Sequence, residues 1–289
     1  MTVTVYPEPD LVVRARALVG EGPVWDQRSG RLCWVDLVAG MLFEEDLAAA
    51  RHRRWTLATL LGAAVPRRSQ PGFAVAIAEG FGFVVDGDLS VADAALPEPY
   101  RRMNDAACDS RGRLWAGSTH LNFTPAGGAL HRWDGTSPST VMATGFTLPN
   151  GLGWSPDDTT MYLVDSVGHT LLSASYSPDD GVVGDFTPLS TIDEGLPDGL
   201  AVDIDGCIWV AIWGGAAVHR YSPNGELIGR VPLPVAKPSS CAFGPDGTLY
   251  ITSASTDLDE VELAMQPLAG SVFALASGTH GVPVMPFAA

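Results

Sequence analysis

The chain has 289 residues, with 33 acidic against 17 basic side chains and a formal net charge of −16. A surface this acidic repels phosphate backbones, which excludes nucleic-acid-binding proteins. Hydrophobic residues make up 46% of the chain, enough for a core, yet no apolar run approaches the roughly 18 to 20 residues that span a bilayer. These values predict a soluble protein without a membrane segment.

The four cysteines lie far apart and form neither a Cys-x-x-Cys pair nor a zinc-ribbon spacing: Cys33, Cys108, Cys207 and Cys241. Thiols in this arrangement are typical of reduced core residues rather than of a disulfide framework. The start of the chain has no basic segment followed by an apolar one, so no secretory signal is visible. We therefore expect a cytoplasmic protein.

A pattern recurs along the chain, in which a turn rich in Asp, Gly or Ser-Pro precedes a short apolar strand led by an aromatic residue. In chain order the copies occupy 26–36, 69–76 (degenerate), 109–117, 155–165, 203–211 and 244–252. One strand residue from each copy gives steps of 40, 41, 47, 47 and 41 residues, at Trp34, Ala74, Trp115, Tyr162, Trp209 and Tyr250.

Steps of about 40 to 47 residues match the four-stranded blade of a β-propeller, and six of them use the whole length. No window has a sustained apolar period of about 3.6 residues, so helices should be few. The sequence predicts one all-β domain over residues 1–289, a six-bladed β-propeller. The residues after Gly278 are a candidate closing strand for the first blade.

The innermost strands of a propeller line its central channel, so equivalent residues of different blades meet at one mouth. Counting back 11 to 13 residues from the repeat positions gives a carboxylate or carboxamide in four blades, and Gly62 and Ser239 in the other two. The four polar residues are Glu21, Asn104, Asn150 and Asp198. Asn-Gly and Asp-Gly are common turn pairs, but a turn would not confine oxygen acceptors to one register. Such oxygens suit Ca²⁺, Mg²⁺ or Mn²⁺, and a mixed set also holds Zn²⁺. We predict an axial divalent-metal site.

Several motifs together resemble the SMP-30/gluconolactonase/regucalcin family over essentially the whole chain. They are Glu21-Gly-Pro-Val-Trp25, Arg102-Met-Asn-Asp105, Gly112-Arg-Leu-Trp-Ala-Gly117, Leu148-Pro-Asn-Gly-Leu152 and Pro197-Asp-Gly-Leu200. The resemblance implies a six-bladed propeller that binds one divalent cation on its axis and hydrolyses sugar lactones. It implies Ca²⁺ or Zn²⁺ as the cation, with Mg²⁺, Mn²⁺ or Fe²⁺ as alternatives.

By the same resemblance, Glu21, Asn150 and Asp198 are the metal ligands, and Asp198 is also the general base. Arg102 and Asn104 match residues that contact sugar hydroxyls. The chain departs from some animal members at Ser118-Thr-His-Leu-Asn122, where those have a substrate-contacting Glu. The identity of the lactone therefore stays open, as does contact of His120 or Asn122 with substrate. His131 and His219 occupy matching blade positions, so we expect them to pack within blades or at the surface.

Two alternatives to a lactonase remain at this point. Related propellers place similar ligands on the axis in metal-dependent phosphotriesterases and arylesterases, whose pockets should be apolar. The fold also allows a non-catalytic calcium-binding propeller. The chain contains no Gly-x-Ser-x-Gly, His-Glu-x-x-His or P-loop motif. The pattern leaves the choice between monomer and dimer open.

Overall fold

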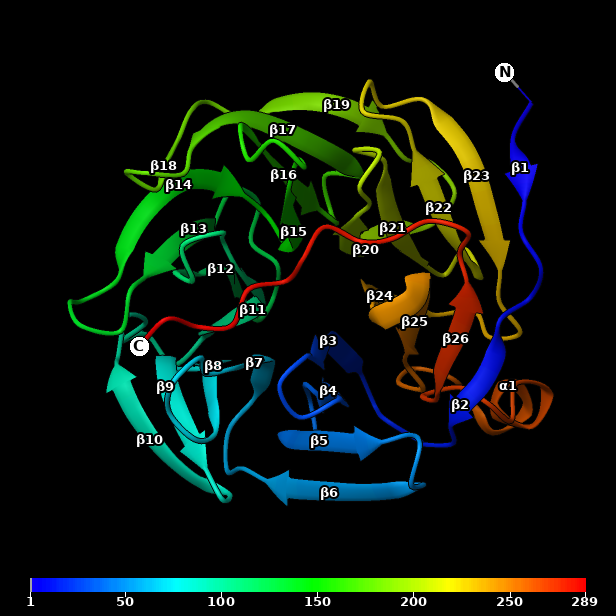
Figure 1. The fold of residues 1–289 in the computed structure, drawn as a ribbon, viewed down its shortest axis with the longest axis horizontal. Helices are drawn as coiled ribbons and strands as arrows, with labels where there is room; N and C mark the ends of the chain where they lie inside the picture. The colour runs from blue at the N-terminus through cyan, green and yellow to red at the C-terminus, as the bar shows by residue number, and fades with distance from the viewer. Residues whose placement is uncertain (1) are drawn as a thin grey trace.

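The computed structural model describes residues 2–289 as a closed ring of six sheets around a central channel (Figure 1). Each sheet is one blade of a propeller, and its innermost strand lies along the channel. The innermost strands, in blade order, are β3 (Gly20–Asp26), β7 (Leu61–Pro66), β11 (Arg101–Cys108), β15 (Pro149–Trp154), β20 (Leu196–Val202) and β24 (Pro238–Phe243). The predicted all-β, six-bladed propeller is confirmed.

Three further layers complete each blade. The second strands are β4 (Arg31–Asp36), β8 (Phe73–Ile77), β12 (Leu114–His120), β16 (Thr160–Asp165), β21 (Ile208–Trp213) and β25 (Thr248–Ser253). The third strands are β5 (Met41–Asp46), β9 (Gly80–Val85), β13 (Gly128–Trp133), β17 (Thr170–Ser177), β22 (Ala217–Tyr221) and β26 (Val272–Ala276). The outer edges carry β6 (Arg51–Thr56), β10 (Asp88–Asp93), β14 (Thr140–Phe146), β18 (Val182–Val183) with β19 (Thr187–Thr191), β23 (Leu227–Pro232) and β2 (Asp10–Val13).

Three short elements lie outside the four-layer pattern. Strand β1 (Thr4–Val5) pairs in parallel with β23 as a fifth strand of the fifth blade. The one α-helix of the described residues, α1 (Glu260–Met265), lies between β25 and β26, and a 3-10 turn (Pro245–Gly247) precedes β25. No helix within residues 2–289 has the length and hydrophobicity that a membrane crossing requires.

The six repeat positions all fall in the second strands of the six blades, and all six side chains are buried. In two blades an aspartate fixes the aromatic ring. Asp109, fully buried, accepts hydrogen bonds from Trp115 Nε1 at 2.8 Å and from Arg113 Nε at 2.6 Å. Asp203 accepts from Trp209 Nε1 at 2.9 Å in the same way. The recurrence of Asp before Trp therefore serves the blade core. All four cysteines are free and buried, as predicted.

The ring is closed by the N-terminal segment. Strand β2 pairs with β26 and supplies the fourth strand of the sixth blade, which the local chain leaves incomplete. The expectation that the residues after Gly278 close the first blade is wrong, because β3 to β6 already complete that blade. Those residues instead cross one end of the channel (Figure 1), where Phe287 is fully buried and stacks 5.1 Å from Trp133.

Candidate metal centre and active site

A β-bulge near the start of each innermost strand shapes the centre of the ring. In β11 the pairing with β12 shifts between Met103 and Ala106, so that Asn104 and Asp105 lie opposite one residue. Equivalent shifts occur in all five other blades. A bulge redirects side chains and often adjoins an active site. Each predicted axial residue lies in one of these bulges or directly beside it.

Close approach of neighbouring blades requires glycine at two of these bulges. A Cβ at Gly62 would lie 1.9 Å from the carbonyl oxygen of Asn104, and one at Gly151 would lie 2.4 Å from the backbone nitrogen of Leu200. Gly151 follows Asn150 inside a strand, with no positive φ. Its Asn-Gly pair is therefore a packing feature that brings β15 against β20, rather than a turn.

Hydrogen bonds link predicted side chains from three neighbouring blades near the channel. Asn150 Nδ2 donates a hydrogen bond to Asp198 Oδ1, and also to Ser166 Oγ at 3.2 Å. Arg102 Nη1 donates to Asn104 Oδ1, while Asn104 Nδ2 donates to the carbonyl of Pro149 at 3.0 Å. These bonds connect the third, fourth and fifth blades around one point.

The carboxylates at this point repel one another in a dry environment. Burial raises the pKa of Glu21 well above its usual range, and the charges of Asp198 and Asp105 raise it further. Burial likewise raises the pKa of Asp198, again with a contribution from Asp105. Burial raises the pKa of Asp105 to about 7. Three buried carboxyls that repel one another form an environment that favours a bound cation.

Arg102 supplies the positive charge nearest to these carboxyls. Its guanidinium opposes the upward pKa shifts of Glu21 and Asp198. Burial lowers the pKa of Arg102 itself to about 10, so it stays protonated at neutral pH. The single positive charge of Arg102 does not neutralise three carboxylates, so the centre can accept further positive charge.

The donor set fits a hard divalent cation. Asn150 Oδ1 is buried and has no hydrogen-bond partner among residues 2–289, although the amide nitrogen of the same side chain has two. Glu21 and Asp198 are 4% and 6% exposed and add carboxylate oxygens. No three His, Cys, Asp or Glu side chains of residues 2–289 form a ligand cluster by themselves. The set is instead a mixed one, in which an amide oxygen completes two carboxylates.

The other two blades present neither a carboxylate nor a carboxamide at the axial position. Gly62 has no side chain. Ser239 Oγ donates to the carbonyl of Gly20 and lies 3.1 Å from Thr252 Oγ1, so its hydroxyl holds the sixth blade against the first.

Sequence reasoning missed three aspartates of this centre. Asp105 follows Asn104 in the same bulge and adds the third buried carboxyl. Asp36 accepts from the backbone nitrogens of Leu18 and Val19 at 2.8 and 3.2 Å, just before Glu21. Asp165 accepts from those of residues 147 and 148 at 2.9 Å each, just before Asn150. For Asp36 and Asp165 the sequence did contain a signal, because the second strand ends in an acidic residue in just these two blades.

The histidines divide as expected. His131 Nε2 lies 2.9 Å from Ser118 Oγ, and burial lowers the pKa of His131 to about 4. Burial lowers the pKa of His219 to about 4 as well. Both are blade-packing residues, as predicted. His120 lies at the mouth, half-buried, with Nε2 unpartnered and its ring 5.3 Å from Tyr100. Asn122 accepts from Thr124 Oγ1 at 2.8 Å in its own turn.

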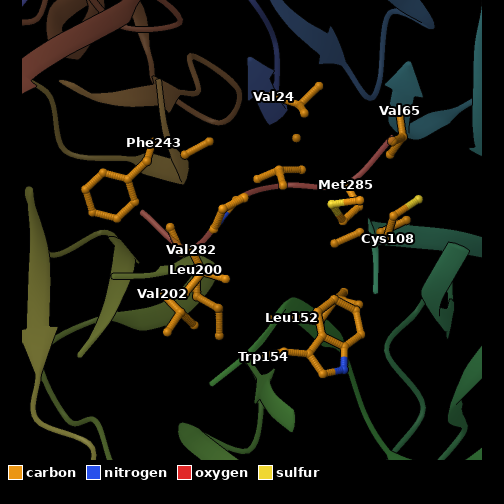
Figure 2. Close-up of a pocket in the computed structure, with 18 of the residues that line it drawn as sticks. Val24, Val65, Cys108, Leu152, Trp154, Leu200, Val202, Phe243, Val282 and Met285 are labelled. Atoms are coloured by element: carbon orange, nitrogen blue, oxygen red, sulfur yellow. The ribbon is translucent and has the colours of Figure 1, made fainter. Parts of the chain in front are cut away.

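A cavity of about 320 Å³ occupies the other half of the channel, between the innermost strands and the C-terminal segment. Figure 2 shows its largely apolar lining, which includes Leu152, Trp154, Leu200, Val282 and Met285. Asp105 also lines this cavity, and its charge acts on Glu21 and Asp198, so the cavity adjoins the polar centre at this residue.

Comparison with known proteins agrees with this architecture. Residues 19–255 match the family model described as the SMP-30/Gluconolactonase/LRE-like region. The chain is 35% identical to a 6-deoxy-6-sulfogluconolactonase of Pseudomonas putida, over 91% of this chain and 92% of the relative. It is 33% identical to the pentonolactonase XacC of Haloferax volcanii, over 94% and 95%.

The fold is also that of a solved structure from Agrobacterium tumefaciens, described as a calcium-binding protein, regucalcin. The two superpose with a TM-score of 0.90 at 28% sequence identity, over 99% of each chain. The family match, the relatives of similar length and this likeness confirm the resemblance seen in the motifs. The chain belongs to the SMP-30/gluconolactonase/LRE-like family.

Proposed function

We propose that this protein is a metal-dependent sugar lactonase that opens an aldonolactone to the aldonic acid. The observation that carries the proposal is the axial centre itself, where an unpartnered amide oxygen and buried carboxylates adjoin the Arg102–Asn104 pair. Relatives named for lactones with different sugar portions support the substrate class.

Glu21, Asn150 and Asp198 would hold one divalent cation, with Ca²⁺ or Zn²⁺ as the first candidates and Mg²⁺, Mn²⁺ or Fe²⁺ as alternatives. The likeness to a protein described as calcium-binding supports a divalent ion. When bound, such an ion supplies a Lewis acid that polarises the lactone carbonyl.

Asp198 is the proposed general base. It takes a proton from the water whose oxygen attacks the carbonyl carbon, and the tetrahedral adduct then breaks its bond to the ring oxygen. The same carboxyl returns the proton to that oxygen, which leaves as a hydroxyl of the open-chain acid. The hydrogen bond from Asn150 Nδ2 fixes the orientation of the Asp198 carboxylate.

Arg102 and Asn104 are placed to hold the sugar. Their side chains are hydrogen-bonded to each other, so each presents its remaining polar groups in a fixed direction. The Arg102 guanidinium has five donors and bonds only Met103 O and Asn104 Oδ1 among the described residues. The remaining donors suit hydroxyl oxygens, and fixed donors reduce the entropic cost of positioning the substrate.

The test is acid release from glucono-, galactono-, xylono- and arabinonolactone, measured with a pH indicator in weak buffer above the spontaneous rate. We expect hydrolysis of at least one lactone and its loss with a chelator. An aryl ester and a phosphotriester serve as competing substrates. Turnover of these in place of lactones would support the arylesterase or phosphotriesterase alternative. Tight cation binding without any turnover would support a non-catalytic calcium-binding propeller.

A further inference from the structure

A second ring of side chains lies just outside the axial residues, at the mouth of the channel. It comprises the residue two positions before each axial position, and all six are half-buried: Val19, Leu60, Arg102, Leu148, Leu196 and Lys237. Arg102 and Leu196 lie in strands β11 and β20, and the other four members directly precede the innermost strands of their blades, so the ring marks the entry to the channel. Four members are aliphatic and two are cationic.

The two cations belong to opposite blades of the ring. Arg102 belongs to the third blade and Lys237 directly precedes β24 of the sixth, so two blades separate them in either direction around the ring (Figure 1). A small ring-shaped substrate held by Arg102 and Asn104 at one side therefore has its opposite side toward Lys237.

Lys237 is the sole lysine of a chain with 33 acidic residues. It nevertheless makes no ion pair within residues 2–289. Its Nζ donates one hydrogen bond, to the carbonyl of Thr256 at 2.7 Å, and lies 5.2 Å from the ring centroid of Trp213. Two of the three donors of the ammonium thus have no partner in the described part of the chain. In so acidic a protein, an ammonium without an ion-pair partner is suited to bind an anionic group of a ligand.

Lys237 contacts the neighbouring fifth blade at the end of the ring where the innermost strands begin. Trp213 pairs with Leu196, another member of the mouth ring, and so lies at this same end of its blade. A cation–π contact with the Trp213 ring also holds the Lys237 ammonium in place. Ser239, the axial residue of this blade, is engaged with Gly20 and Thr252. The Lys237 ammonium is therefore the polar group through which the sixth blade can bind a ligand.

We propose that Lys237 binds an anionic group on the exocyclic end of the sugar lactone, and so selects lactones that carry a carboxylate, sulfonate or phosphate there. This inference rests on the proposed lactonase function. Charge-assisted hydrogen bonds to such a group are shorter and stronger than those to a hydroxyl. The local cations also offset the repulsion that a net charge of −16 imposes on an anionic substrate.

The experiment compares kcat and KM for glucono-1,5-lactone, its 6-phosphate and the lactone with a 6-carboxylate. The proteins are wild type, Lys237→Gln, Lys237→Arg and, as a charge-matched control, Arg53→Gln on the exposed outer strand β6. We expect wild type to prefer both anionic lactones. In Lys237→Gln, kcat/KM for these should fall about 10- to 100-fold through KM. The neutral lactone and the cation content should change little. Lys237→Arg should retain the preference, and Arg53→Gln should match wild type.

Three results would overturn this inference while leaving the lactonase function intact. They are hydrolysis without preference for anionic lactones, an equal loss for neutral and anionic lactones in Lys237→Gln, and an unchanged preference in that variant. Hydrolysis of none of the three lactones by metal-loaded wild type would reject the lactonase proposal and this inference together. A preference for the phosphate alone or the carboxylate alone would identify the kind of anion.

Discussion

Asp198 is the residue on which most of the proposed chemistry depends, because it is both a ligand and the base. Asp198→Asn keeps an oxygen donor of nearly the same size but removes the base. Turnover should fall about 10²- to 10⁴-fold, while cation binding weakens without being lost, since Glu21 and Asn150 remain. The measurement is lactone hydrolysis by the variant after saturation with cation and confirmation of its occupancy. Turnover near that of wild type would leave Asp198 as a ligand only.

Asp165 illustrates a residue that acts through another. It accepts hydrogen bonds from the backbone nitrogens of residues 147 and 148, and this fixes the segment that presents Asn150. Asp165→Ala should weaken cation affinity about 10-fold, the order seen when outer partners of ligands are lost. The matched control is Asp134→Ala, because Asp134 also accepts from two backbone nitrogens but lies in an exposed turn. Calorimetric titration with cation should separate the two variants, and equal affinities would remove the positioning role of Asp165.

At the scale of the element, the repeated Asp-to-Trp contact determines blade stability. Asp109 accepts from Arg113, Trp115 and the hydroxyl of Tyr176, which lies in the next blade. Asp109→Asn should lower the free energy of unfolding by about 1–3 kcal/mol, because an amide nitrogen then faces hydrogen-bond donors inside the blade core. Asp179→Asn removes an exposed partner of Arg111 and should cost less than about 1 kcal/mol. Urea denaturation of both variants tests this, and similar losses would contradict it.

The β12–β13 pair contains a pH-dependent contribution to stability. Burial and the charge of Arg101 lower the pKa of His131 from 6.5 to about 4, so its ring stays neutral in the folded state. The unfolded chain binds more protons between these values, and stability falls as the pH is lowered through that window. His131→Gln should reduce the difference in unfolding midpoint between about pH 7 and about pH 5. His52→Gln on the exposed strand β6 should keep the wild-type difference, and an unchanged difference in His131→Gln would contradict this account.

At the scale of the whole molecule, the sequence predicted the features that recur from blade to blade and missed those that occur only once. The spacing of the turns and aromatic residues located all six blades, because every blade must bury the same strand. The register of Glu21, Asn104, Asn150 and Asp198 followed from the same periodicity. Closure of the ring did not, since β2 is a single short strand whose partner, β26, is more than 250 residues away.

The residues that support the centre were also beyond reach of the pattern. Asp105 is adjacent to a predicted site residue, but the bulge that turns it toward the axis shifts the side-chain alternation by one residue. The requirement for Gly62 and Gly151 depends on how closely neighbouring blades approach, which no local sequence states. A role for Lys237 in ligand binding can be inferred only from the fold, which places its blade opposite that of Arg102 across the channel.

The measurement that tests the account most directly is a parallel titration of bound cation and lactone hydrolysis. Protein stripped by a chelator is reloaded stepwise with Ca²⁺, Zn²⁺ or Mn²⁺, and both quantities are measured in the same samples. We expect hydrolysis to be absent from the stripped protein, to rise in proportion to occupancy and to reach its maximum at one cation per chain. Full hydrolysis without cation, or full occupancy without hydrolysis, would contradict it.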